Sequence, residues 1–368
     1  MPDDDLRDLE DIWMLGLCDW FTDRVEFQQW LIGSRADSAR FFWGHAKPAT
    51  GKYVLSSHVI TIVVSSTTTA ANHYFFRHGD KVRSTFSGCL LSLLSQMTLR
   101  NPVVRGRILA MIDHGVRFER DNAKNIWRKL IEPIIASPGL SQVQYWVIDA
   151  LDECAEISAV FAILSKLEPT LPFKVFLTSR RTDEIVQDFT HLHNTLGINP
   201  LLMAEIQAQD TQGAIALYLE TNKHKLHVGT EIQGRLLLDR ISRKSQGCFM
   251  WVRLVLEELS TLLTFQQVEQ VLEEVPEEMD LLYSRALGQI ASRPAKSIAI
   301  SRAIIMWTLC AIRPMTVDEL QSALQLGIGT TVEDLNEGIP SLCSQLFHVD
   351  KNGRVLMVHL TAKTFLQT

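Results

Sequence analysis

Short apolar segments of strand length recur through the first half of the sequence, with helical spacing between them. They occupy residues 40–43, 72–76, 144–148 and 174–177, and a weaker one lies near 196–201. The runs are continuous rather than alternating, which is typical of strands buried on both faces. Strands of this kind separated by helices predict an α/β fold with a parallel sheet covered by helices.

The second half of the sequence has an almost wholly helical pattern from residue 210 onward. Thr316, with Glu319 three residues later, predicts a capped helix start, and the helix is expected over 317–326. Residues 346–349 and 354–359 flank the turn at 350–353 and predict a β-hairpin. Helices followed by a terminal hairpin indicate a winged-helix-like unit.

We therefore expect four parts along the chain of 368 residues. They are an N-terminal helical segment at 1–39, the α/β domain at 40–205, a helical domain at 206–295 and the winged-helix-like domain at 296–368.

Charge and cysteine spacing exclude several classes of protein. The net charge is −6, with 36 Lys and Arg against 42 Asp and Glu, whereas a dedicated nucleic-acid binder normally shows a basic excess. The six cysteines have no metal-ligand spacing and are interpreted as reduced thiols of a cytoplasmic protein. The acidic start at residues 3–5 excludes a secretory signal peptide. The longest apolar stretch, at 303–312, is too short to span a membrane, which takes about 20 residues.

The first candidate site lies between the first apolar run and a helix, which is the context of a phosphate-binding loop. In such a loop, backbone N–H groups face the phosphates and a lysine neutralises their charge. Against the pattern GxxxxGK[ST], Gly51 and Lys52 match, but Ala46 replaces the first glycine and Tyr53 replaces the hydroxyl that holds Mg²⁺. A plain strand, turn and helix with a surface lysine would leave the same pattern. The candidate loop residues are Ala46, Lys47, Pro48, Ala49, Thr50, Gly51, Lys52 and Tyr53.

The second candidate site is an apolar run that ends in acids. Asp149 follows four apolar residues, and Asp152 and Glu153 come directly after it. A strand of this kind delivers a carboxylate to a bound metal at the carboxyl edge of a sheet. Asp149 would bind Mg²⁺, and Asp152 or Glu153 would polarise the attacking water. The alternative is a buried strand followed by a helix whose dipole the acids stabilise.

The third candidate site follows the run at 174–177, which is expected to lie beside the acidic strand. Thr178 or Ser179, together with Arg180, could sense the γ-phosphate of a nucleotide from this neighbouring strand end. A polar strand terminus with an exposed arginine is the alternative interpretation.

Together these motifs resemble those of NACHT-type NTPases of the STAND class, the signal-transduction ATPases with numerous domains, and in particular the NACHT proteins of filamentous fungi. In those proteins the loop reads close to GKPGSGKS, the acidic strand ends in DALDEC and the next strand ends in TSR. DALDEC is intact at 149–154 and TSR stands at 178–180. Segments 26–31, 247–252, 313–320 and 358–366 are also similar, so the resemblance covers about residues 20–368.

The resemblance implies a nucleotide-gated switch in which residues 40–205 form a P-loop NTPase domain. ADP would hold a closed form, and exchange for ATP would permit self-association or binding of protein partners. His359 resembles a winged-helix histidine that contacts the nucleotide in relatives, although a core histidine on the terminal strand would fit equally. No effector or repeat domain is evident, so we expect a core without its input module, either a short relative or a fragment.

The altered loop limits the expected chemistry. Losing the metal hydroxyl should reduce hydrolysis far more than binding, because the metal stabilises charge that develops during transfer. We therefore expect ATP or ADP binding, weakened Mg²⁺ binding and weak or absent ATPase activity. The alternative is a pseudo-NTPase scaffold that does not bind nucleotide appreciably. A small-molecule phosphotransferase on the same fold is disfavoured, because the long helical C-terminal half shows no acceptor-site motif.

Overall fold

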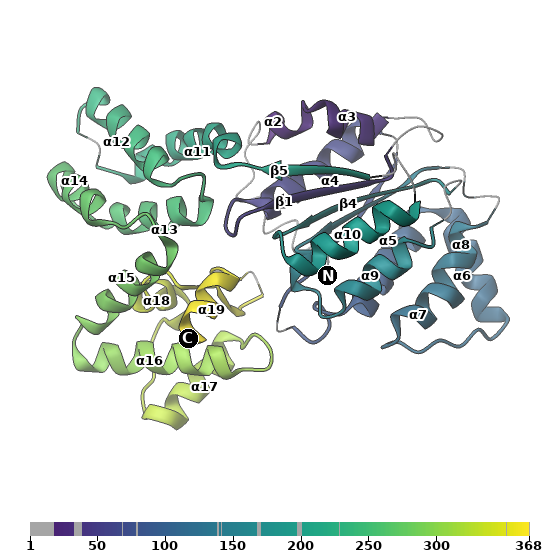
Figure 1. The fold of residues 1–368 in the computed structure, drawn as a ribbon. Coiled ribbons are helices and arrows are strands. Elements are labelled where there is room, and N and C mark those ends of the chain that lie inside the picture. Colours follow the sequence, from purple (N-terminus) through teal and green to yellow (C-terminus); the bar gives the residue numbers. More distant parts are fainter. Residues whose placement is uncertain are drawn as a thin grey trace. The chain divides into compact units, whose positions relative to one another are not determined.

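The computed structural model describes residues 18–32, 39–67, 69–78, 80–137, 140, 142–167, 171–196, 201–227, 229–350 and 352–367. These residues form two units. The first contains the described residues of 1–47 and 52–207, and the second contains 48–51 with the described residues of 208–368. In Figure 1 the first unit runs from purple to teal, and the second is green to yellow beyond its first helix.

A parallel sheet of five strands forms the centre of the first unit, as the apolar runs predict. The strand order is β2-β3-β4-β1-β5. The β3 and β4 strands are hydrogen-bonded neighbours, with Ile148 opposite Leu177, so the expectation that the acidic strand adjoins the TSR strand is confirmed. All the pairings are parallel, which brings the carboxyl ends of these strands to one edge. The strands are β1 (Phe41–Ala46), β2 (Ala71–Phe75), β3 (Gln144–Asp149), β4 (Phe173–Ser179) and β5 (Leu201–Ile206).

The position expected for the fifth strand was wrong by several residues. A helix continues to Leu196, residues 197–200 lie outside the described part, and the strand begins only at Leu201. The expected range 196–201 overlaps the strand only at Leu201, because the few apolar residues of this short segment do not fix where a strand begins.

Helices cover both faces of the sheet (Figure 1). The helices α3 and α4 pack on one face, whereas α5, α9 and α10 contribute to the core on the other. The helical segments of this unit are α2 (Asp19–Thr22), α3 (Val25–Ile32), α4 (Lys52–Ser66), α5 (Phe86–Arg100), α6 (Pro102–Asp113), α7 (Ala123–Ile126), η1 (Trp127–Ile131), α8 (Glu132–Ile135), η2 (Leu151–Glu153), α9 (Ile157–Leu164) and α10 (Asp183–Leu196).

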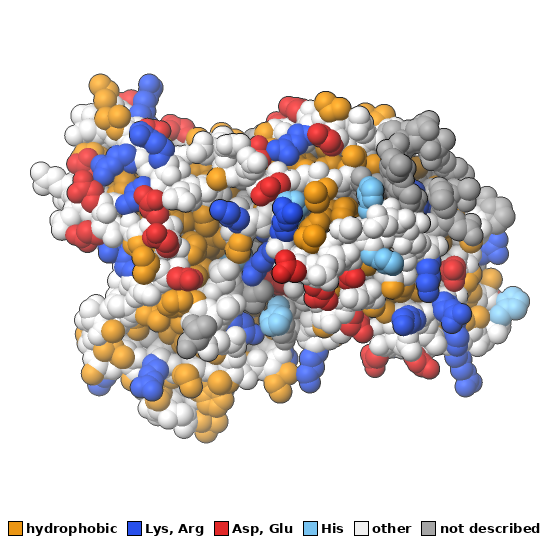
Figure 2. Space-filling view, viewed as in Figure 1, with side chains coloured by type: hydrophobic (Ala, Val, Ile, Leu, Met, Phe, Trp, Pro, Cys, Tyr) orange, Lys and Arg blue, Asp and Glu red, His pale blue; other side chains and the backbone are white. Residues whose placement is uncertain are grey.

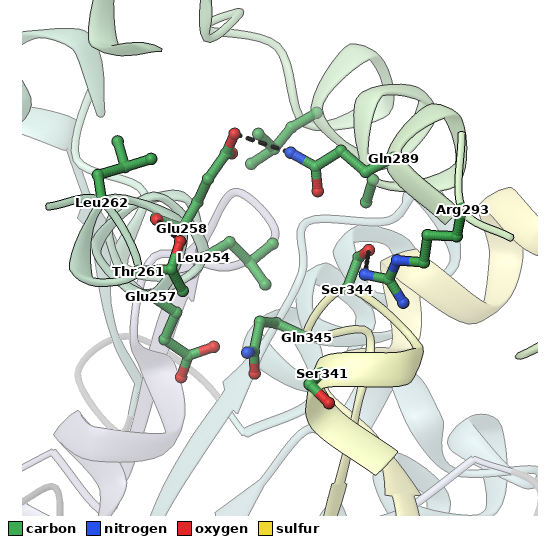
Figure 3. A pocket seen from close by; sticks show the side chains of 12 residues that line it. Leu254, Glu257, Glu258, Thr261, Leu262, Gln289, Arg293, Ser341, Ser344 and Gln345 are labelled. Carbon is green, nitrogen blue, oxygen red and sulfur yellow. Dashed lines mark hydrogen bonds between the residues drawn. The ribbon is translucent and has the colours of Figure 1, made fainter. Parts of the chain in front are cut away.

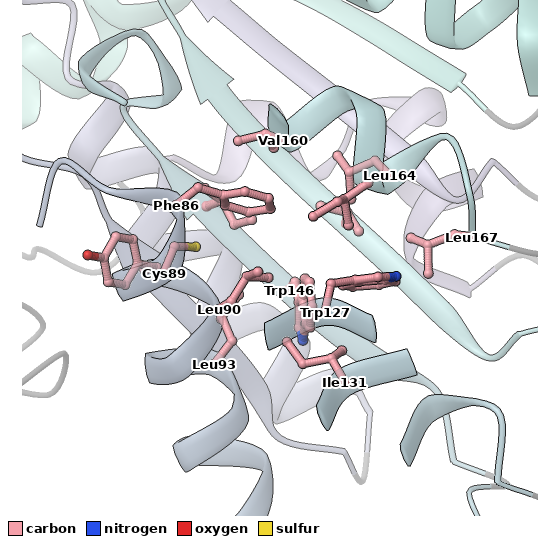
Figure 4. Packing of buried hydrophobic residues seen from close by; sticks show 14 of the residues in the cluster. Phe86, Cys89, Leu90, Leu93, Trp127, Ile131, Trp146, Val160, Leu164 and Leu167 are labelled. Atoms are coloured by element: carbon pink, nitrogen blue, oxygen red, sulfur yellow. The ribbon is translucent and has the colours of Figure 1, made fainter. Parts of the chain in front are cut away.

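Alternate residues of the strands build two separate apolar layers. Phe42 and Phe176 stack with their ring centroids 5.4 Å apart, and Trp30 of α3 joins them on that face. On the other face, Trp146 of β3 packs among side chains of α5, α9 and η1 (Figure 4). Both faces of the sheet are therefore covered by apolar side chains, which explains why its strands are continuous apolar runs.

The second unit is helical and ends in a small hairpin. The capping box expected at Thr316 is present, since Thr316 Oγ1 accepts from the Glu319 N–H and the Glu319 carboxylate accepts from the Thr316 N–H. The expected hairpin is also confirmed, with β6 and β7 antiparallel. The elements are α11 (Ala208–Asn222), η3 (Lys223–Lys225), α12 (Glu231–Lys244), α13 (Phe249–Ser260), α14 (Phe265–Glu274), α15 (Met279–Ala291), α16 (Ala295–Cys310), α17 (Val317–Ile328), α18 (Leu335–Leu342), β6 (Phe347–Val349), β7 (Val355–Met357) and α19 (Leu360–Gln367).

No helix among the described residues combines the length and apolar character that crossing a membrane requires.

A buried lysine ties α3 to the sheet. Lys174 of β4 is 5% exposed, and its Nζ donates to the carbonyl oxygens of Trp30 at 2.6 Å and Leu31 at 3.3 Å. The hydroxyl of Tyr145 donates to the same Leu31 oxygen at 2.9 Å. The last carbonyls of a helix have no partners within it, so these donors complete the C-terminal end of α3.

We predict that Lys174 makes the stability of the fold depend on pH. Burial lowers the pKa of Lys174 to about 8, below the 10.5 of an exposed lysine. Between these values the unfolded chain binds the proton and the folded chain does not, so the free energy of unfolding contributed by this group rises as the pH increases from 8 to 10.5. In urea unfolding, Lys174→Met should remove this rise, whereas Lys166→Met at an exposed lysine should keep it. An unchanged pH slope in Lys174→Met would contradict the assignment.

Candidate functional site

The turn between β1 and α4 contains two residues in left-handed backbone conformation. Gly51 has φ 87° and Ala49 has φ 62°. Glycine adopts this region freely, but the Cβ of alanine makes it strained. Ala49 stands where the resembled loop GKPGSGKS has its second glycine, so this is the departure with a conformational consequence, and the sequence analysis missed it.

The replacement of the first glycine has no such consequence. Ala46 is the last residue of β1 and pairs with Ile206 of β5 in regular parallel register. Any residue adopts extended backbone, so alanine at this position is not strained.

Lys52, the first residue of α4, folds back onto its own loop. Its Nζ donates to the carbonyl oxygens of Lys47 at 2.8 Å and Ala46 at 3.2 Å. Burial lowers the pKa of Lys52, and the nearby Asp152 and Asp149 carboxylates oppose that effect. The ammonium group therefore lies within reach of the loop backbone and in the field of acids from β3, where an incoming phosphate would compete with the carbonyls.

The carboxylate of Asp149 is buried at the end of β3, where its side chain is held by two hydroxyl groups. The residue is 4% exposed, and its Oδ1 accepts from Ser56 Oγ at 2.7 Å and from Thr178 Oγ1. Burial raises the pKa of Asp149, while the bonds from Thr178 and Ser56 oppose that rise. Ser56 lies one helical turn after Lys52, and only this i+4 spacing in α4 could have indicated it from the sequence.

Tyr53 lies against β2. Its ring packs edge-on against Phe75, with centroids 5.0 Å apart and planes at 70°. The hydroxyl that reaches Asp149 from α4 thus comes from Ser56, three residues later. The aromatic contact explains why a tyrosine is accommodated at position 53.

Asp152 and Arg180 form a two-point pair between η2 and the end of β4. Arg180 Nε lies 3.1 Å from Asp152 Oδ2, and the Arg180 backbone N–H donates to Asp152 Oδ1 at 2.9 Å. The side chain of Asp152 is 8% exposed and that of Arg180 is 26% exposed. This pair orients both groups, but it also occupies the carboxylate that was a candidate for polarising water.

Glu153 is the other candidate, and its surroundings differ. Burial raises its pKa to about 7, while the His78 backbone N–H, which donates to Oε2 at 2.8 Å, acts in the opposite direction. A carboxyl group with a pKa near 7 exchanges its proton readily at neutral pH. A general base that works at neutral pH needs such a pKa, and the role of Glu153 stays a prediction.

The structure brings most of the predicted residues of the first unit to one edge of the sheet. Lys52 interacts electrostatically with Asp149, Asp152, Glu153 and Arg180. Among the described residues, no group of three or more His, Cys, Asp and Glu side chains could hold a metal by itself. The roles expected for these residues stay predictions.

His359 belongs to the second unit and directly precedes α19. Its Nδ1 accepts from the Thr361 N–H at 3.2 Å and lies 2.8 Å from the Thr361 hydroxyl. The residue follows β7 and is not part of that strand, so the alternative of a histidine on the terminal strand was wrong. Its expected contact with a nucleotide stays a prediction.

A separate cavity of about 360 Å³ lies in the second unit between α13, α15 and the segment after α18 (Figure 3). The Glu258 carboxylate on its wall accepts from Arg285 at 3.1 Å and from Gln289 at 2.8 Å. Glu257 is paired with Arg253 at 3.3 Å. Both carboxylates already have cationic partners, so we assign the cavity no ligand.

Two family comparisons match different parts of the chain. Residues 16–180 are similar to the family described as nephrocystin 3, N-terminal, and residues 289–368 to the family described as GPI inositol-deacylase, winged helix domain. The second match agrees with the capped helices and hairpin at the end of the chain. No curated protein matches the sequence.

Solved structures resemble the chain only distantly. Cdc6p from Pyrobaculum aerophilum is 9% identical, with a TM-score of 0.39 and coverage of 98% of this chain and 93% of that one. Drosophila ORC bound to DNA is 13% identical, with a TM-score of 0.41 and coverage of 99% of this chain and 98% of that one. The Aeropyrum pernix ORC1 protein in complex with DNA is 14% identical, with a TM-score of 0.37 and coverage of 100% of this chain and 92% of that one. These likenesses carry no conclusion about activity.

We predict opposite effects of glycine at the two alanines of the loop. Ala49→Gly should stabilise the fold by about 0.5–1 kcal/mol, because it removes left-handed strain that exceeds the added flexibility of the unfolded chain. Ala46→Gly should destabilise it by about 0.5–1 kcal/mol, because glycine weakens a strand. Urea unfolding of both variants measures the difference. Equal effects of the two changes would contradict the strain assigned to Ala49.

We also predict that Ser56 supports the buried carboxylate. Ser56→Ala should lower the free energy of unfolding by about 1–2 kcal/mol, because Asp149 would lose a hydrogen bond in a dry environment. The control is Ser57→Ala, a buried serine of the same helix whose hydroxyl is not bonded to Asp149, and its effect should stay within about 0.5 kcal/mol. A loss as large in Ser57→Ala would refute a specific role for Ser56.

Proposed function

We propose that this chain is the nucleotide-binding core of a NACHT-type switch, which binds ADP or ATP at the loop 46–53 and hydrolyses ATP slowly. One observation carries the proposal: Lys52 lies in its loop in the field of three acids from the β3 end and of Arg180 from the neighbouring β4. The similarity of residues 16–180 to a NACHT-like family supports the same class.

The loop fits a phosphate group. Left-handed residues at positions 49 and 51 make a turn of the kind in which successive backbone N–H groups converge on an anion. The helix α4 starts directly after it, so its positive end adds to the attraction. Lys52 would exchange its two carbonyl partners for phosphate oxygens, which are charged and therefore stronger acceptors.

Slow hydrolysis is expected from the residues at the positions that would hold Mg²⁺. When bound with ATP, Mg²⁺ neutralises charge that develops on the transferred phosphate. Tyr53 packs on Phe75, and the Asp149 oxygen that would face the ion already accepts from Ser56 and Thr178. These side chains can hold Mg²⁺ only after rearrangement, so binding should survive better than turnover. Glu153 would accept the proton of the attacking water.

A scaffold without appreciable nucleotide binding is the second candidate. The loop is closed by the bonds of Lys52 to its own carbonyls, and Asp152 is neutralised by Arg180. Both pairs would have to open before a triphosphate could bind. A pseudo-NTPase would retain this arrangement, in which the charged groups of the site already have partners within the chain.

The remaining features of the class are part of the proposal. We infer a cytoplasmic switch, similar to the fungal NACHT proteins, that associates with itself or with protein partners when ATP replaces ADP. His359 would contact the phosphates in the closed form. The fold that carries such a site is common to many functions, so these points depend on the resemblance and on the experiments below.

Calorimetric titration with ADP and with Mg-ATP tests the site directly. The wild-type chain should bind ADP with a dissociation constant of about 1 μM, and Lys52→Ala should weaken it at least about 100-fold, because one cation opposite two phosphates is lost. Lys166→Ala, at an exposed lysine of the same unit, is the control and should leave the affinity unchanged.

The outcomes separate the two candidates. Binding that disappears in Lys52→Ala supports the switch. No heat with either nucleotide supports the scaffold. In a turnover assay, Tyr53→Ser should raise ATP hydrolysis if the missing hydroxyl at position 53 alone limits it, and unchanged hydrolysis would show that position 53 alone is not limiting.

A further inference from the structure

One region of the first unit has a charge opposite to that of the rest of the chain. Residues 100–129 contain eight Lys and Arg against three Asp and Glu, a balance of 8 − 3 = +5, whereas the whole chain is −6 and the remainder is therefore −6 − 5 = −11. The region comprises α6, α7, η1 and the loop between α6 and α7. Its exposed cations are Arg100, Arg105, Arg107, Arg117, Arg120, Lys124, Arg128 and Lys129, and its three acids, Asp113, Glu119 and Asp121, are exposed as well.

The same region exposes apolar side chains that the core does not use. The inward stripe of α6 is Val104, Ile108 and Met111, which pack on the core of the unit. A second stripe, Leu109 and Ile112, points outward, with exposures of 55% and 65%. Residues three or four apart share a helix face, so α6 has two apolar faces although folding requires only one.

Two further exposed apolar side chains flank α6 along the sequence. Val116 in the following loop is 38% exposed, and Leu99 at the end of α5 is 70% exposed. The guanidinium of Arg105 donates to the Thr98 and Leu99 carbonyl oxygens, which holds a cation beside this apolar surface. Figure 2 shows Lys and Arg side chains gathered over the part of the first unit that carries α6 and α7, with hydrophobic side chains among them.

We propose that this surface, formed by the exposed side chains of residues 100–129, docks the protein on a membrane that contains anionic lipids. Leu109 and Ile112 would enter the boundary between headgroups and acyl chains, and the surrounding arginines would face lipid phosphates. The chain would lie on the membrane and not cross it. This inference does not depend on nucleotide binding.

The mixture of side chains favours a membrane over other anionic partners. Nucleic acid, or a polypeptide made only of acidic residues, would satisfy the arginines but leave the outward Leu and Ile side chains in water. A lipid interface satisfies both, because apolar burial and charge attraction act on the same surface. The strongly negative remainder of the chain would be repelled by anionic lipid, which orients the protein with this region toward the membrane.

Vesicle co-sedimentation of the full chain tests the proposal. We expect binding to phosphatidylcholine vesicles with about 30 mol % phosphatidylserine at about 0.1 M salt, little binding to pure phosphatidylcholine, and strong reduction at about 0.5 M salt. Arg107→Glu with Arg120→Glu should reduce the partition at least about tenfold. Leu109→Asn with Ile112→Asn should also reduce it about tenfold, because apolar burial is lost.

Matched controls keep the test specific. Lys296→Glu with Arg302→Glu reverses two exposed cations of α16, which matches the charge change of the double arginine variant, and should leave vesicle binding unchanged. All changed side chains are exposed, so circular dichroism and the unfolding midpoint should be unaltered.

Several results would overturn the proposal. One is equal binding to neutral and anionic vesicles, and another is no loss in either double variant. If polyglutamate or a DNA duplex binds as tightly as the vesicles and the Asn variant changes nothing, the partner is a soluble polyanion and the membrane assignment fails.

Discussion

The buried carboxylate of Asp149 is the interaction on which the functional edge of the sheet depends. An isolated carboxylate in a dry interior is costly, so it must be hydrogen-bonded or neutralised. Ser56 of α4 and Thr178 of β4 provide the donors, and Lys52 provides a nearby positive charge. Three elements that are far apart in the sequence are thereby tied together.

The charged groups of the candidate site already have partners within the protein. Arg180 neutralises Asp152, Lys52 is bonded to its own loop, and Asp149 is held by hydroxyls. Each pair can be broken by a ligand that offers a stronger partner, and a phosphate offers one for Lys52 and for Arg180. Breaking these pairs costs free energy and lowers the affinity for a nucleotide. The same geometry is therefore compatible with a regulated nucleotide site and with a scaffold that does not bind nucleotide appreciably. The balance between them is a difference of free energies and not a matter of which residues are present.

Much of the fold is predictable because its signals are local. The continuous apolar runs lead to strands buried on both faces, and Thr316 with Glu319 leads to a capped helix. The parallel sheet, the neighbouring positions of β3 and β4 and the terminal hairpin follow from such patterns. The fifth strand was misplaced because its apolar pattern is weak, and periodicity over a few residues does not fix where a strand begins.

The sequence alone determined the chemistry available: a lysine after a glycine turn, three acids after one strand and an arginine after the next. It did so because each of these signals depends on residues that are neighbours along the chain. Only the tertiary structure decided which groups are already paired, that Ser56 takes the hydroxyl position near Asp149, and that Ala49 and not Ala46 is strained. Those facts depend on backbone angles and on contacts between distant segments, which no local pattern records. The outward stripe of α6 is of the same kind, because a helix with two apolar faces reveals which one is buried only after it has packed.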